Sequence, residues 1–154
     1  MSEYTATVRW SLDGGDFAGN RYTRAHEWSF DGGLSVPASA SPHIVPLPHS
    51  VAENVDPEEA FVASLSSCHM LFFLSLAAAE GIVVAAYEDK ASGWLEKDAD
   101  NRMAITRVVL RPRAEYGNGT MPDADALERL HHRAHELCFI ANSVKTKIVT
   151  KIVS

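Results

Sequence analysis

Residues 56–80, DPEEAFVASLSSCHMLFFLSLAAAE, carry the strongest helix signal in the chain. Asp56 is a suitable N-cap, and Pro57 is well tolerated in the first turn of a helix. Glu58 and Glu59 place negative charge at the positive end of the helix dipole. The sequence therefore predicts one long helix that begins at Asp56 and ends near Glu80, with Gly81 as its C-cap.

This predicted helix is apolar enough to raise the question of a membrane span. The run from Ala60 to Ala79 has the length that crosses a bilayer, but serines and a histidine interrupt it and no second apolar span exists. We therefore expect the central helix of a globular core, covered on most sides. Its expected buried stripe consists of Phe61, Leu65, Cys68, Phe72 and Leu76.

Length and composition indicate one globular domain over residues 1–154. The net charge of −6 argues against a basic surface for nucleic acid or anionic membranes. The first twenty residues hold no apolar stretch of the signal-peptide type, so a cytoplasmic, reducing location is expected. Two cysteines are too few for a disulfide scaffold or a four-cysteine zinc module.

The remaining segments predict strands and a second helix. Strands are expected at residues 4–10, 21–30, 34–36, 82–96, 103–116 and 143–153, and the second helix from Pro122 to about Ile140. The order β-β-β-α-β-β-α-β is typical of an α+β fold with mostly antiparallel strands. The proline-rich stretch 37–57 is expected to be a long loop, which is either functional or a plain surface excursion.

The two cysteines are the main candidates for chemistry. Cys68 falls in the middle of the first helix and Cys138 near the end of the second. Seventy residues separate them, so spacing alone does not make them partners. Free cysteine is among the most buried residue types, and two inert core thiols are the simplest interpretation. A redox pair is the alternative, and it requires a specific microenvironment.

Histidines on the second helix offer one such environment. His131, His135 and Cys138 are spaced i, i+4 and i+7 and share a helix face. This row is compatible with a zinc site or with an imidazole beside a thiol, although the spacing matches no established zinc pattern. Half-exposed histidines beside a core stripe remain the plain alternative.

The segment from Asp56 to Cys68 resembles the P-E…C segment of the OsmC/Ohr proteins, the osmotically inducible and organic-hydroperoxide-resistance family. The resemblance extends over nearly the whole chain. An N-terminal β-unit has a turn at Asp31-Gly32, and the second cysteine lies near the end of a late helix before a final strand. The sequence is similar to an OsmC-like subgroup rather than to the hydroperoxide branch, in which proline commonly follows the second cysteine.

The resemblance implies an intertwined homodimer with active sites at the subunit interface, and thiol-dependent reduction of organic hydroperoxides. Cys68 would be the peroxidatic thiol and Cys138 the resolving thiol, reset by an external dithiol of the lipoyl type. Glu58 would orient an arginine that activates Cys68; Arg24 is the best match and Arg21 the second. In a continuous helix Glu58 lies about 15 Å from its own Cys68, so a shared role would need the partner subunit.

An apolar substrate pocket is expected beside Cys68. Phe61, Leu65 and Phe72 share the stripe of Cys68 and are expected to line an apolar pocket for an alkyl hydroperoxide. No cofactor and no resident metal are expected. The alternatives are thiol chemistry on another electrophile or disulfide, and a metal- or small-molecule-binding protein that uses the face of His131, His135 and Cys138.

Overall fold

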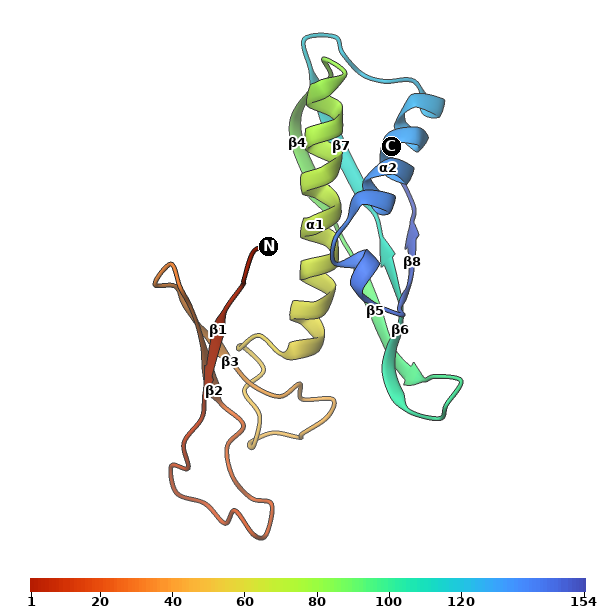
Figure 1. Ribbon diagram of the computed structural model, residues 1–154. Helices are drawn as coiled ribbons and strands as arrows, with labels where there is room; N and C mark the ends of the chain where they lie inside the picture. The colour runs from red at the N-terminus through yellow and green to blue at the C-terminus, as the bar shows by residue number, and fades with distance from the viewer. The chain divides into compact units, whose positions relative to one another are not determined.

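The computed structural model describes all of residues 1–154. Its contacts group the chain into two compact units, Met1–Ala60 and Phe61–Ser154. The boundary falls in the first turn of the long helix α1 (Pro57–Ala79), which is one continuous helix. Figure 1 shows the elements of each unit.

The N-terminal unit is built on a three-stranded antiparallel sheet in the order β1-β2-β3. Its strands are β1 (Ala6–Arg9), β2 (His26–Phe30) and β3 (Ser35–Ala38), all shorter than expected or shifted. The hairpin at Asp31-Gly32 is present, with Phe30 and Leu34 hydrogen-bonded across it. Pro37 lies inside β3 rather than in the following loop, which an edge strand tolerates.

The start of α1 is closed by a reciprocal pair of hydrogen bonds. The Glu59 backbone N–H donates to Asp56 Oδ1 at 2.8 Å, and the Asp56 N–H donates to Glu59 Oε2 at 3.3 Å. This capping box satisfies two of the amide groups that a helix start leaves unpaired. At the other end Gly81 has a φ of 75°, and the Ile82 N–H bonds to the carbonyl oxygen of Ala77. The predicted bounds of this helix are therefore confirmed to within one residue.

Between α1 and the second helix, the second unit holds four strands where the sequence predicts two. They are β4 (Val83–Asp89), β5 (Ser92–Lys97), β6 (Met103–Leu110) and β7 (Pro112–Gly117). The breaks fall at Lys90-Ala91 and at Arg111, so that β4 pairs with β7 and β5 with β6 in two separate sheets. The Asp89 carboxylate holds the chain at these breaks: it accepts hydrogen bonds from the Arg111 N–H at 2.6 Å and from the Ser66 hydroxyl at 2.5 Å.

The chain ends with a helix, a short turn and a strand. Helix α2 (Ala124–Leu137) is capped by Asp123, and a 3₁₀ turn follows at Ala141–Ser143. Strand β8 (Lys147–Thr150) adds to β6 as the one parallel pair among five strand pairings. The α+β class with mostly antiparallel strands is confirmed.

The buried face of α1 differs from the expected stripe. Its buried residues are Leu65, His69, Phe73 and Ala77, one position round the helix from Cys68 and Phe72. Phe73 forms a core cluster with Leu130 and Ala134 of α2, while Leu65 packs with Val108 and Leu110 of β6. His69 occupies this otherwise apolar stripe, so the hydrophobic spacing of the sequence indicates the neighbouring face instead.

Much of α1 is left uncovered by the rest of the second unit. The helix is long and apolar enough to cross a membrane by length and composition, a test that core helices also pass, and 22% of its most apolar window is buried. Leu71 is 59% exposed. The expectation of a helix covered on most sides is therefore not met within the second unit.

Candidate active site

Cys68 lies in the middle of α1, on the uncovered side of the helix. It is a half-buried free thiol, next to the fully buried His69. Neighbouring positions on this side are small or polar: Ser64, Ser67 and Ser75 are all exposed. The thiol is therefore accessible from outside the second unit.

Cys138 is brought to Cys68 by the end of α2. It is the C-cap of that helix, is 99% buried and has an extended backbone, and its N–H bonds to the His135 carbonyl oxygen. The two thiols are close enough that Cys68 acts on the pKa of Cys138. The Ala141 N–H donates to Cys138 Sγ at 3.4 Å from the turn that follows. The fold thus places together two cysteines that the sequence alone does not pair.

The environment of Cys138 keeps it protonated. Burial, and then the neighbouring Cys68 thiol, raise the pKa of the Cys138 thiol to about 11, although the Ala141 N–H acts in the opposite direction. A thiol is a weak nucleophile in its protonated form. At neutral pH Cys138 can donate its S–H to Cys68 but is a poor first nucleophile.

An open apolar pocket of about 460 Å³ lies beside Cys68. Its apolar walls come from Leu71 and Phe72 of α1 and from Phe139 and Ile140 after α2. Phe139 is 70% exposed and meets Phe72 edge-on, with ring centroids 4.9 Å apart. The pocket therefore offers an aromatic surface directly next to the half-buried thiol.

Only one of the three predicted pocket residues lines this site. Phe72 does, whereas Leu65 is 1% exposed inside the core and Phe61 packs against the same core cluster. Phe61 and Leu65 do not line the pocket beside Cys68, because this part of the helix stripe packs against β6 in the core. The sequence analysis does not predict three residues that line the pocket, Leu71, Phe139 and Ile140. The apolar pair Phe139-Ile140 directly after Cys138 is the sequence feature that could have indicated them.

Arg24 and Glu58 belong to the N-terminal unit and are not paired there. The Arg24 guanidinium donates to the Tyr22 carbonyl oxygen and to Asn20 Oδ1, both at 2.6 Å, and lies over the Tyr22 ring. Glu58 Oε2 is buried without a hydrogen-bond partner. Arg21, the second candidate, forms an ion pair with Asp16. The predicted Arg24–Glu58 contact is absent from this structure.

The histidine face of α2 is divided between separate contacts. His131 is buried and hydrogen-bonded to His69, His132 pairs with Glu136 at 3.3 Å, and Cys138 pairs with Cys68. Nowhere in the chain do three His, Cys, Asp or Glu side chains converge as metal ligands. The hypothesis of a metal site on His131, His135 and Cys138 is wrong for this geometry, because His131 and His135 line one cavity while Cys138 lies beside Cys68.

Comparison with known proteins supports the resemblance seen in the sequence. A family model described as OsmC-like protein matches residues 50–153. The chain belongs to the OsmC-like family. It is 53% identical to an OsmC-like protein of unknown function from Vibrio cholerae, with a TM-score of 0.97 over 99% of this chain and 100% of the other. No curated protein matches the chain.

More distant OsmC-like structures share the fold. An organic hydroperoxide resistance protein from Legionella pneumophila is 18% identical, with a TM-score of 0.67 over 99% of this chain and 97% of the other. The organic hydroperoxide resistance protein OhrB of Bacillus subtilis is 22% identical, with a TM-score of 0.61 over 97% of this chain and 96% of the other. At these identities the likeness establishes the OsmC-like fold for this chain and leaves its substrate open.

Proposed function

We propose that this OsmC-like protein is a thiol-dependent peroxidase that reduces organic hydroperoxides through Cys68 and Cys138. One observation carries the proposal: a half-buried thiol at an apolar pocket lies beside a second, fully buried thiol. Two inert core cysteines would both be buried and would not face a pocket. Family membership, with hydroperoxide-resistance proteins among the structural neighbours, supports the same choice.

In the first step the Cys68 thiolate attacks the distal oxygen of the hydroperoxide. An S–O bond forms as the O–O bond breaks, and the alkoxide that leaves takes a proton to become the alcohol. Cys68 is thereby oxidised to a sulfenic acid. The Cys138 thiol, which stays protonated, stabilises the attacking thiolate by donating its S–H to it.

In the second step the Cys138 sulfur attacks the Cys68 sulfenic acid. A disulfide forms, and the hydroxyl leaves as water with the Cys138 proton. The contact between the two side chains means that only a small local shift is needed for this bond. An external dithiol then reduces the disulfide by exchange and becomes oxidised itself.

We further propose that the working form is a homodimer. The apolar helix α1 is largely uncovered in one copy, and burying apolar surface is the main favourable term in association. Strand β1 is exposed at all four positions, Val8 included. A second copy is the occupant that would cover such faces and bring in Glu58 or Arg24 of the partner. Light scattering at micromolar concentration tests this, and an active monomer would contradict it.

The decisive experiment is a free-thiol count before and after one equivalent of cumene hydroperoxide. We expect two thiols per chain before and none after, with one equivalent of cumyl alcohol formed. Recovery of both thiols with dihydrolipoamide would complete the cycle. An unchanged thiol count with intact peroxide would exclude the peroxidase function. Thiol loss only with disulfides or other electrophiles would favour the second candidate, thiol chemistry on another substrate, which uses the same pair.

A further inference from the structure

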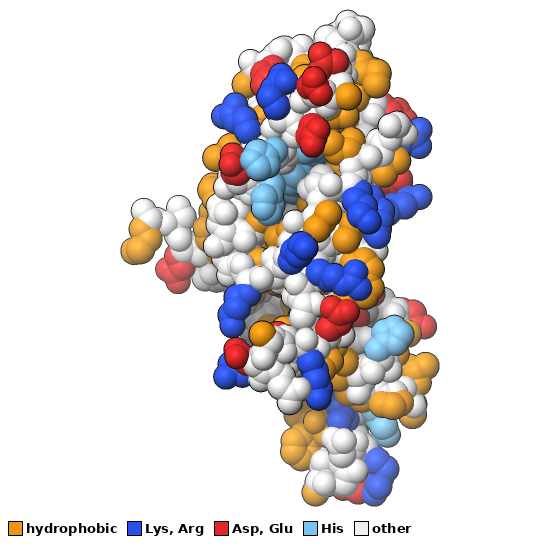
Figure 2. Space-filling view, turned by 90° about the vertical axis from the view of Figure 1, so that its right-hand side faces the viewer, with side chains coloured by type: hydrophobic (Ala, Val, Ile, Leu, Met, Phe, Trp, Pro, Cys, Tyr) orange, Lys and Arg blue, Asp and Glu red, His pale blue; other side chains and the backbone are white.

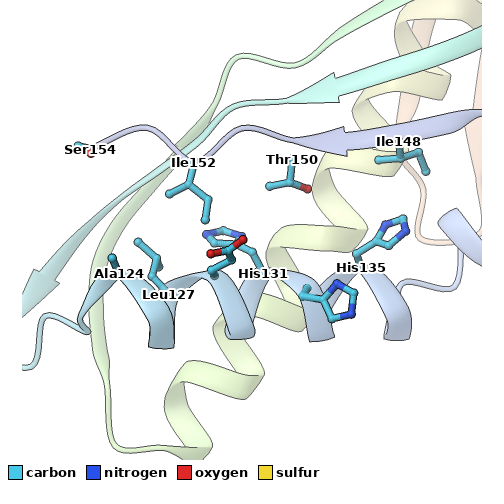
Figure 3. A pocket seen from close by; sticks show the side chains of 10 residues that line it. Ala124, Leu127, His131, His135, Ile148, Thr150, Ile152 and Ser154 are labelled. Carbon is cyan, nitrogen blue, oxygen red and sulfur yellow. The ribbon is translucent and has the colours of Figure 1, made fainter.

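A second cavity of about 570 Å³ lies between α2 and β8, lined by residues other than those of the thiol pocket. One part of its wall is aliphatic, formed by Ala124, Leu127, Ile148 and Ile152. The polar part consists of Glu128, His131, His132, His135, Thr150 and Ser154. Figure 3 shows the His131 side chain between Leu127 and Ile152, directed into this space. Three histidines of α2 line the cavity. Figure 2 shows a group of histidine side chains, in pale blue, on one face of the molecule.

The floor of the cavity is one half of a buried histidine pair. His131 is 97% buried, and its Nδ1 lies 2.9 Å from Nε2 of His69 in a hydrogen bond. The two rings are parallel, and Phe73 stacks on His131 at 4.3 Å between ring centroids. Burial lowers the pKa of each histidine to about 4, so both rings are neutral at pH 7.

The hydrogen bonds of this pair assign its tautomers. Nδ1 of His69 is buried and has no partner. A buried N–H without an acceptor costs more than an unused lone pair, so this nitrogen is the unprotonated one. Nε2 of His69 therefore carries the proton and donates to Nδ1 of His131. The proton of the neutral His131 ring must then be on Nε2, the nitrogen left free of the pair.

His131 Nε2–H is thus a fixed hydrogen-bond donor at the floor of a partly aliphatic cavity. A fixed donor selects a ligand with an acceptor atom, and the aliphatic wall selects an apolar body. The charge of the wall narrows the class of ligand further, because Glu128 lines the cavity and no Lys or Arg does. A carboxylate ligand would meet this negative side chain, and no Lys or Arg of the wall would compensate the repulsion.

We propose that this cavity is a second small-molecule site, which binds a neutral carbonyl compound with an apolar body through the Nε2–H of His131. The site is separate from the proposed peroxidase chemistry, and its test does not depend on that activity. Its volume lies within the usual range for small-molecule pockets and exceeds what a single aromatic ring needs.

The test uses three matched probes on the full chain: acetophenone, ethylbenzene and benzoate. Histidine ring ¹⁵N spectra first check the tautomers, with His69 Nδ1 expected to be unprotonated and His131 Nε2 protonated. Acetophenone should then shift the His131 Nε2 resonance and bind at least tenfold more tightly than ethylbenzene, which lacks an acceptor. Benzoate should bind more weakly than acetophenone, and Glu128→Gln should reduce that difference.

Two variants keep the proposal falsifiable without disturbing the buried pair. Ala124→Leu fills the cavity from the exposed start of α2 and should abolish the acetophenone shift, whereas Leu137→Ala, outside the cavity, should leave it unchanged. The proposal is overturned if acetophenone and ethylbenzene bind equally, or if neither moves the His131 resonances up to their solubility. It is also overturned if Ala124→Leu, shown to be folded, binds acetophenone as the parent does.

Discussion

The Cys138 thiol lies beside the Cys68 thiol, although seventy residues separate the two in the sequence. The contact arises because α2 packs through Leu130 and Ala134 against Phe73, which places the end of α2 beside the middle of α1. One thiol of the pair is half-buried at a pocket and the other is fully buried. This asymmetry assigns different chemistry to the two cysteines.

The first prediction separates these roles. Cys68→Ser should abolish peroxide consumption, because Cys138 is buried and protonated. Cys138→Ser should consume about one equivalent per chain and then stall or over-oxidise for want of a partner thiol. Mass spectrometry of the Cys138→Ser protein should find added oxygen on the peptide that contains Cys68. Full-rate oxidation of Cys138 in the Cys68→Ser protein would reverse the assignment.

The second prediction concerns the pH at which Cys138 reacts. Its pKa is raised to about 11, first by burial and then by the neighbouring Cys68 thiol. In the Cys68→Ser protein the second cause is weakened and the first remains, so alkylation of Cys138 by iodoacetamide should still need alkaline pH. The measurement is the alkylation rate from pH 7 to pH 10.5. A rate already at its plateau at pH 8 would show that Cys138 is not held in its buried place.

The structure shows how far the sequence alone could lead. The bounds of α1 were predictable because Asp56, Pro57 and Gly81 are local signals that act within one turn. The split of residues 82–116 into four strands was not, since it depends on the Asp89 carboxylate of β4 binding the Arg111 N–H at the break between β6 and β7. Long-range hydrogen bonds of this kind leave no trace in local hydrophobic patterns.

In the candidate site, too, some residues could be predicted from the sequence and others could not. The sequence singled out Cys68, Cys138 and Phe72, which do lie together, but it placed Leu65 in the pocket rather than in the core. His69 explains the error. This histidine can be buried on α1 because its ring is hydrogen-bonded to His131, 62 residues further along the chain. A polar residue at a buried position interrupts the apolar pattern by which the buried face of a helix is predicted.

The third prediction follows from that buried pair and concerns stability. The folded-state pKa of His69 and of His131 is about 4, below the ordinary value of 6.5. Protonation therefore favours the unfolded chain: the stability is fully present above pH 6.5 and is lost as the pH falls toward 4. Between pH 7.5 and pH 5 the loss is about 2 kcal/mol for each ring.

Urea unfolding at pH 7.5 and pH 5 measures this loss. His131→Phe, which keeps an aromatic ring on Phe73, should be less stable at pH 7.5 but should lose about half of the pH dependence. His43→Gln, at an exposed position, is the control and should behave as the parent does. An unfolding free energy equal at the two pH values would show that the pair is not buried and neutral.

The fourth prediction tests Arg24 as the activating cation. If a guanidinium stabilises the Cys68 thiolate, Arg24→Met should slow Cys68 alkylation at neutral pH by about tenfold, with recovery in alkali. Methionine keeps much of the apolar stem and removes the charge. Arg21→Met is the matched control, because Arg21 is already paired with Asp16. An unchanged pH profile in Arg24→Met, with a shifted one in Arg21→Met, would transfer the role to Arg21.

The last prediction concerns substrate preference and rests on Phe139. This ring is exposed, meets Phe72 edge-on and lines the pocket beside Cys68. Phe139→Ala removes an aromatic wall that favours aryl and alkyl hydroperoxides over hydrogen peroxide, so the ratio of kcat/KM for cumene hydroperoxide to that for hydrogen peroxide should fall by about tenfold. That fall corresponds to about 1.4 kcal/mol, within the range for an aromatic contact plus its buried area.

A control variant and a second pair of reagents distinguish a change in substrate selectivity from a general loss of Cys68 reactivity in Phe139→Ala. Leu137→Ala, also exposed and two residues away but outside the pocket, should keep the parent ratio. Alkylation of Cys68 by N-phenylmaleimide should slow in Phe139→Ala while alkylation by iodoacetamide stays constant, because only the first reagent carries an aryl group for the wall to hold. Equal slowing of both reagents would mean that Phe139 positions Cys138 and the helix end rather than the substrate. A constant peroxide ratio in a folded Phe139→Ala protein would place the selective surface elsewhere.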